Sequence, residues 1–192
     1  MDSGRFETFI DAIIAIMLTV MVLKIPQPEP MTLAGVWNLR AMYFAYVISF
    51  LVIFNIWDHH RKFFHAVEDI NNKVIWMYST LIFMITLIPF FTAWVAHNPN
   101  DFVPEVLYGL LFLVVNILYI VITRIALKHD IHNSLIEKIK IDEIIIINLI
   151  LFAIGVIISI LGYPIDMLLM CLVSVVVWNV IPYIEKNQGI GD

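Results

Sequence analysis

Long apolar stretches alternate with short polar segments along the whole chain. Six stretches are apolar over about 17 or more residues, enough to cross a hydrocarbon core of roughly 30 Å at about 1.5 Å per residue. A backbone exposed to lipid must form its own hydrogen bonds, so each stretch is expected to be a helix. The pattern predicts an all-α, polytopic membrane protein with six transmembrane helices, at residues 9–25, 40–57, 74–95, 105–125, 143–161 and 165–183.

Turn-forming residues separate these helices. Pro26, Pro28 and Pro30 follow the first, "HNPNDFVP" separates the third and fourth, and "GYP" predicts a tight turn between the fifth and sixth. No internal duplication is evident, so residues 1–184 are expected to form one six-helix transmembrane unit. Residues 185–192, "EKNQGIGD", are expected to form a polar, disordered cytoplasmic tail. The amphipathic linker "IALKHDIHNSLIEKIKIDE" either lies at the membrane surface or extends its flanking helices.

Lysine and arginine are distributed unequally between the two sides. Lys24 and Arg40 are expected on one side, near the acidic Glu29, Asp101 and Glu105. The other side collects Arg5, Arg61, Lys62, Lys73, Arg124, Lys128, Lys138, Lys140 and Lys186. Since cytoplasmic loops are enriched in these cations, both termini are predicted to be cytoplasmic, in a multi-pass protein of the cell membrane.

Composition supports a membrane protein and limits its chemistry. Hydrophobic residues make up 61% of the 192 residues, charged residues 14%, and the mean hydropathy is +0.93. One core of a soluble domain cannot bury so much apolar surface. The net charge of −5 says little, because orientation follows lysine and arginine. A single cysteine, Cys171, excludes a disulfide framework within the chain. The first stretch has no small-x-small cleavage site, so we expect it to be retained as a helix.

Motifs for catalysis or cofactor binding are missing from the sequence. There is no phosphate-binding glycine loop, no zinc-spaced Cys/His set, no nucleophile elbow and no TVGYG-like potassium filter. His59, His60, His65, His97, His129 and His132 lie at or beyond the ends of the predicted helices, where interfacial histidines are ordinary. We therefore expect no enzyme activity, no metal, no cofactor and no nucleic-acid partner.

The first predicted helix carries one narrow stripe along its length. At about 100° per residue, one side collects Arg5, Phe9, Ala12, Ile16, Val20 and Leu23. Thr19 lies roughly 60° to the side of the stripe and Asp11 roughly opposite. Alternating spacings of four and three allow a helix to face copies of itself around an axis, but a packing seam or a lipid-facing surface gives the same pattern.

Asp11 is the unusual residue of this helix. A carboxylate about one turn inside a membrane is costly and usually faces a protein partner, although hydrated headgroups offer an alternative. The second helix ends at the same level with "WDHHRKFF", so His59 or His60 is a reasonable partner. We expect Asp11 to be buried in its own protomer and hydrogen-bonded near His60.

Several segments together resemble the transmembrane protein 175 family of potassium channels. "RFETFIDAIIAIMLTVMVLKI" resembles the first-helix signature R-x-x-x-F-S-D followed by an A-I-x-x-T-x-x-x-L helix. "YVISFLVIFNIWDHHRKFF", "IWMYSTLIFMITLIPFFTAW" and "EVLYGLLFLVVN" resemble the second, third and fourth helices of the family. The last two helices fit only in length and hydropathy.

The resemblance implies roles for particular residues. Arg5, Phe9 and Asp11 match the signature, and the pore-constricting aliphatics of the family fall on Ile16, Val20 and Leu23. Thr19 matches the mid-helix threonine near the constriction and would act in selectivity. Ile10 stands in place of the signature serine, and Tyr78 where an asparagine is common; with His60, Tyr78 is a candidate partner in the polar network that holds the first helix.

The family implies a function and an assembly. Members with one six-helix repeat assemble as tetramers, so the resemblance implies a homotetramer in the lipid bilayer with four first helices at its axis, through which potassium ions pass. A ring of aliphatic side chains would then take the place of a carbonyl filter. A proton-conducting or ion-coupled secondary transporter, with Asp11 and the histidines as a relay, is the alternative, and a non-conducting scaffold is a second.

Overall fold

The computed structural model of the chain describes residues 3–67, 72–127, 141–162 and 166–187. All regular structure in these ranges is helical, which confirms the all-α prediction. The elements are α1 (Ser3–Val22), α2 (Leu33–Asn38), α3 (Arg40–Ala66), α4 (Asn72–Thr86), α5 (Ile88–His97), α6 (Phe102–Leu127), α8 (Ile141–Ile160) and α9 (Asp166–Asn187).

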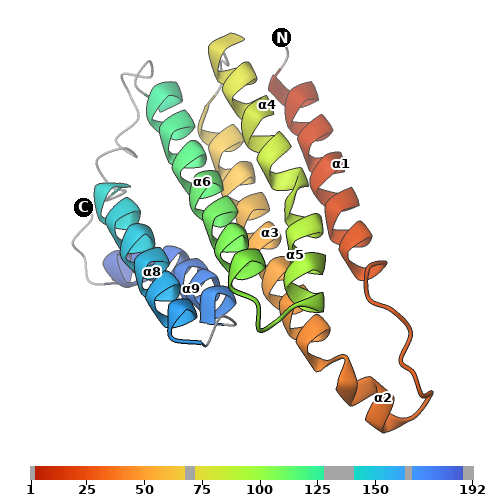
Figure 1. Cartoon of the computed structure of the whole chain (residues 1–192). Helices are drawn as coiled ribbons and strands as arrows, with labels where there is room; N and C mark the ends of the chain where they lie inside the picture. Colours follow the sequence, from red (N-terminus) through yellow and green to blue (C-terminus); the bar gives the residue numbers. More distant parts are fainter. Residues whose placement is uncertain (1–2, 68–71, 128–140, 163–165, 188–192) are drawn as a thin grey trace.

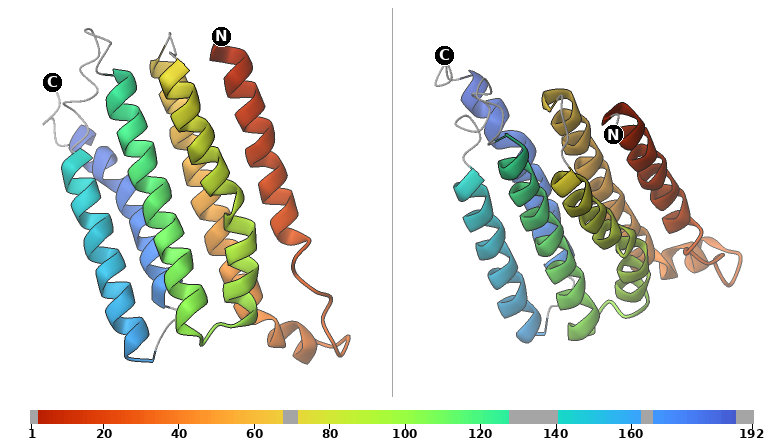
Figure 2. Two further views of the ribbon diagram at one scale, coloured as in Figure 1. Left: turned by 45° about the horizontal axis from the view of Figure 1, so that its top comes forward. Right: turned by 90° about the horizontal axis from the view of Figure 1, so that it is seen from above.

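The helices form two layers that pack face to face (Figures 1 and 2). One layer contains α1, α3 and α9, and the other contains α4 with α5, α6 and α8. Helix α1 lies at one edge of the bundle, where its main neighbours are α3 and α5, and α8 lies at the opposite edge against α6 and α9. Helix α1 therefore has fewer neighbours than the central helices α3 and α6.

The six predicted spans correspond to α1, α3, the α4–α5 pair, α6, α8 and α9. Helix α1 begins at Ser3, earlier than predicted, and includes the charged residues before the apolar stretch. Helix α3 continues beyond its predicted end through "DHHRKFFHA" to Ala66. By length and composition, three helices in the described ranges are apolar enough to cross a membrane: Arg40–His65, Asn72–His97 and Phe102–Ala126. The apolar parts of α8 and α9 are shorter, at Ile144–Ile160 and Asp166–Asn179.

Three local features differ from the prediction. The short helix α2, capped by the Thr32 side chain, was not predicted, because six residues are too few to show a periodic pattern. The third span is interrupted between α4 and α5, where Pro89 lacks an N–H and its ring conflicts with the preceding helical turn. Helix α9 runs to Asn187, three residues into the segment predicted to be a disordered tail.

The connections agree with the turn signals where they are described. Helix α1 ends at Val22, ahead of Pro26, and α8 ends just before Gly162. Gly162 has a φ of +94°, a conformation that glycine adopts without steric cost. The rest of the "GYP" turn, and most of the amphipathic linker, lie outside the described residues.

A buried group of hydroxyls ties the two layers together near the α4–α5 interruption. Ser49 of α3 lies 2.9 Å from the Tyr108 hydroxyl of α6 and 2.8 Å from Thr92 Oγ1 of α5. Thr92 Oγ1 is also 2.8 Å from the carbonyl oxygen of Ile88. These three side chains are at most 6% exposed, so each depends on the others for hydrogen bonds.

Candidate pore-lining face

Helix α1 has one face inside the protomer and one face outside it. The buried face consists of Phe6, Ile10, Ile14, Met17 and Met21. On the other side, Phe9 and Ile16 are each 60% exposed and Leu23 is 80% exposed. The protomer on its own therefore leaves a row of large apolar side chains uncovered along α1.

The predicted constriction residues lie on this uncovered face. Arg5 and Ala12 are exposed there with Ile16 and Leu23, and Val20 is half-buried at its margin. Thr19 is also exposed, and its hydroxyl donates a 2.8 Å hydrogen bond to the Ile16 carbonyl oxygen of its own helix. The bond uses the hydroxyl proton and leaves the lone pairs of the Thr19 oxygen available as acceptors.

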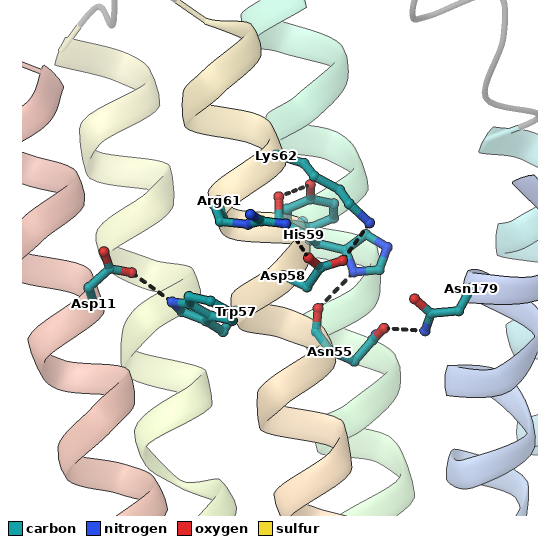
Figure 3. Close-up of polar contacts among 9 residues, drawn as sticks. Asp11, Asn55, Trp57, Asp58, His59, Arg61, Lys62 and Asn179 are labelled. Carbon is teal, nitrogen blue, oxygen red and sulfur yellow. Dashed lines mark hydrogen bonds and ion pairs between the residues drawn. The ribbon is translucent and has the colours of Figure 1, made fainter. Parts of the chain in front are cut away.

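Asp11 lies at the boundary between the two faces, beside α3. The indole Nε1–H of Trp57 donates a 3.0 Å hydrogen bond to Asp11 Oδ1 (Figure 3). His60 Nε2 lies 3.6 Å from the same oxygen. The Asp11 side chain is 44% exposed, so the expectation of a buried carboxylate is wrong. At this boundary, α3 covers one side of the carboxylate and leaves the other open.

His60 and Tyr78 form the inner part of this polar contact. His60 Nδ1 lies 2.6 Å from the Tyr78 hydroxyl, and both side chains are 1% exposed. The rings of Phe6, Phe63 and Phe64 surround the pair. The structure thus brings Asp11, His60 and Tyr78 of three different helices into one cluster. Ile10, at the position of the signature serine, is fully buried in the apolar contact instead.

Within the described ranges, no group of three or more histidine, cysteine, aspartate and glutamate side chains is positioned to hold a metal ion. Along α1 the accessible chemistry is that of an apolar surface with two hydroxyls (Thr8 and Thr19), two partly exposed carboxylates (Glu7 and Asp11) and the Arg5 guanidinium.

Comparison with known proteins finds similarity to membrane channels. The family model described as "Endosomal/lysosomal potassium channel TMEM175" matches residues 5–89. A potassium channel of Chryseobacterium sp. (strain P1-3) is 28% identical over 138 residues, 72% of each chain. A potassium channel of Streptomyces collinus is 31% identical over 99 residues, 50% of this chain and 48% of the relative. The chain is therefore similar to TMEM175 channels, over residues 5–89 for the family model and over 72% of its length for the Chryseobacterium relative.

The fold of a solved TMEM175 structure is similar over almost the whole chain. The crystal structure described as a lysosomal potassium-selective channel TMEM175 homolog from Chamaesiphon minutus superposes with a TM-score of 0.75 at 22% identity. The superposition covers 94% of this chain and 97% of that one. The match to the TMEM175 family model includes α1, α3 and α4, which carry every residue of the candidate site.

Sequence reasoning missed two parts of the site region. Trp57 was not recognised as the hydrogen-bond donor to Asp11, because His59 and His60 lie close to it in the sequence and can also donate. Asn55 of α3 and Asn179 of α9, 124 positions apart, pair through their side chains at 2.7 Å (Figure 3). His59 lies next to this pair and bonds the Asn55 carbonyl oxygen at 2.7 Å. No sequence signal connects residues so distant.

A charged group on α3 was detectable from its spacing. Asp58 accepts a 3.0 Å hydrogen bond from Arg61 and pairs with Lys62, at separations of three and four residues (Figure 3). The Arg61 guanidinium also lies 5.7 Å from the centroid of the Trp57 ring. These charged side chains lie on the accessible side of α3, next to the Trp57 ring.

Proposed function

We propose that the chain forms a potassium-permeable cation channel, a homotetramer in which α1 of each copy faces a central axis. The observation that carries the proposal is the uncovered apolar face of α1, at the edge of a bundle whose fold matches a solved TMEM175 channel. The relatives named as potassium channels support potassium as the permeant ion. Orientation with both termini in the cytoplasm follows from the positions of lysine and arginine.

Ile16, Val20 and Leu23 form the hydrophobic constriction of this channel. Four isoleucine side chains that converge on an axis leave little space for a hydrated ion, and they offer a dehydrated ion no ligand. Such a ring closes by excluding water, with no charged gate. The Thr19 oxygens, near the constriction, supply the nearest polar ligands, so we expect only modest discrimination between potassium and sodium.

The test is ion flux through purified protein in a planar bilayer with potassium chloride on both sides. The wild type should conduct, and Ile16→Asn should wet the ring and raise conductance while reducing the preference for potassium over sodium. A barrier lower by about 1.4 kcal/mol corresponds to roughly tenfold faster passage.

Ile157→Asn is the matched control. Ile157 on α8 is 58% exposed, almost as much as Ile16, but lies at the opposite edge of the bundle. Its substitution should leave the current unchanged. Equal currents from wild type and Ile16→Asn would show that ions do not pass along this face of α1.

The Asp11–His60–Tyr78 cluster favours proton conduction as a second candidate. The same bilayer distinguishes the two under a pH gradient at equal potassium. A potassium channel gives a reversal potential that is unaffected by the pH gradient, whereas a proton-conducting protein gives one that follows it.

A further inference from the structure

Two outward faces of the bundle differ in chemistry. From Ile144 onward, every exposed side chain of α8 is aliphatic: Ile146, Leu149, Ile150, Ala153, Ile154, Ile157 and Ile160. The exposed side of α4 and α5 alternates aromatic and hydroxyl side chains, with Trp76, Ser79, Thr80, Phe83, Thr86 and Phe90. An aliphatic surface suits lipid tails, whereas small hydroxyl residues are enriched where membrane helices pack against protein.

The hydroxyl side chains on the exposed face of α4 allow another helix to pack closely against it. Ser79, Thr80 and Thr86 donate to carbonyl oxygens of their own helix, at 2.8, 3.1 and 2.6 Å. Each hydroxyl proton is therefore satisfied without water. What remains is a small side chain between aromatic ones, which lets a neighbouring helix approach closely.

A complementary surface lies on the other layer, along α3. Phe50, Phe54 and Trp57 form a ladder of rings, with Phe50 and Phe54 stacked at a centroid distance of 6.5 Å. Phe54 is 48% exposed. The α3 and α4–α5 surfaces lie on opposite layers but both border α1, as the view along the bundle shows (Figure 2).

Helix α1 continues the α3 surface. Thr8 and Ala15 lie roughly 80–100° around the helix from Ile16, on the side that leads to Asp11 and α3. Both are exposed. A face of α1 directed at an axis through Ile16 would leave these small side chains uncovered unless a neighbouring copy packs on them.

Charged residues at the end of the bundle where α1 begins also favour contact between the α4–α5 surface of one copy and the α3–α1 surface of another. Glu7 and Asp11, four residues apart on α1, are partly exposed at its border with α3. Lys73, in the first turn of α4, is exposed and has no ion-pair partner in the part of the chain that the structure describes. A basic side chain on one flank thus lies at the level of acidic side chains on the other.

We infer that the α4–α5 face of each copy packs against the α3–α1 flank of the next copy. This inference rests on the proposed tetramer and names its subunit interface. The two surfaces differ, so the contact is heterologous, and a fourfold rotation closes it into a ring. Helix α8 then lies at the outer rim, where its aliphatic face meets lipid.

The relative heights of residues along α3 and α4 identify positions for a disulfide crosslinking experiment. The bond between His60 and Tyr78 sets the two helices at a common level. Phe54 is six residues from His60 and Phe83 five residues from Tyr78 in the same direction, about 9 and 7.5 Å along the two helices. Phe54→Cys is therefore combined in one chain with Phe83→Cys, in a Cys171→Ala background, and oxidised in native membranes.

The expected result is a ladder of disulfide-linked dimers, trimers and tetramers from the double variant, and no crosslink from either single variant. Co-expression of the two single variants should give dimers. Phe54→Cys combined with Ser79→Cys or Thr86→Cys scans the same face of α4 and allows for a tilt between copies. Ile150→Cys with Ile157→Cys on α8 is the matched control and should remain monomeric.

A separate variant tests the tetramer itself. Ile16→Cys should crosslink with its own counterpart if α1 surrounds an axis. Crosslinks at position 16 with none from Phe54→Cys paired with any of the three α4 positions would overturn the interface and leave the channel proposal intact. No crosslinks at position 16 either would contradict both.

Discussion

At the scale of single residues, Thr19 is the position where selectivity and conductance are expected to separate. Valine has nearly the same shape as threonine but lacks the oxygen that could bind an ion. Thr19→Val should therefore reduce the preference for potassium over sodium more than it changes conductance, as measured by reversal potentials under mixed gradients. Thr8→Val, an exposed threonine nearer the start of α1, is the matched control and should leave the preference unchanged. A selectivity equal to that of the wild type in Thr19→Val would exclude the hydroxyl as a ligand.

Asp11 is expected to matter for stability through Trp57. Asp11→Ala removes the acceptor of the indole N–H and should lower the stability of the folded protomer by about 1 kcal/mol. Trp57→Phe removes the same bond from the other side. If the two residues act through this bond, the double variant should lose less stability in detergent than the sum of the single variants. Strict additivity would mean that Asp11 acts through His60 or through solvent instead.

The candidate site shows which single-residue inferences a sequence permits. The stripe along α1 was predictable because helical periodicity alone decides which side chains share a face. The exposure of Asp11 was not predictable from the sequence, because it depends on how far α3 extends over α1. The donor to Asp11 was also undetermined, since the choice of Trp57 depends on the rotation of α3 about its own axis.

At the scale of helices, the hydroxyl group of Ser49, Thr92 and Tyr108 is expected to stabilise the packing of α3 against α5 and α6. Ser49→Ala removes the hydrogen bond between Ser49 and the buried Tyr108 hydroxyl and should cost about 0.5–2 kcal/mol. Ser79→Ala, where the hydroxyl is exposed and bonds only its own helix, is the control and should cost much less. Thermal unfolding in detergent measures both. Equal costs would indicate that the buried contact contributes nothing beyond helix propensity.

The number and order of the long helices were predictable from hydropathy, because each span must satisfy its backbone within itself. The ends of the helices were less predictable. Helix α3 continues nine residues beyond the predicted span, since polar residues such as Asp58, Arg61 and Lys62 pair with one another along the helix and do not end it. The interruption at Pro89 was visible as a proline, but whether it kinks or ends a helix depends on tertiary contacts.

At the scale of the whole molecule, the distribution of lysine and arginine predicts an orientation that can be measured. Single cysteines in place of Lys73, at the start of α4, and Asp101, between α5 and α6, lie at opposite ends of the bundle. In a Cys171→Ala background, a membrane-impermeant thiol reagent added to intact cells should label position 101 and not position 73. Permeabilised cells should show labelling at both. The reverse pattern in intact cells would place the termini outside.

The charged beginning of α1 has a consequence for how the chain enters the membrane. Between Asp11 and Lys24 there are only twelve uncharged residues, fewer than the roughly 20 that a helix needs to be inserted on hydrophobicity alone. During synthesis, the first segment should therefore wait at the translocon, or insert reversibly, until α3 and α4 emerge and supply Trp57, His60 and Tyr78. A nascent chain that stops after Pro30 should resist integration into microsomes, while one extended to Asn100 should integrate α1 efficiently. The helix proposed to line the conduction path would then be the last of the first three to become a stable part of the bilayer.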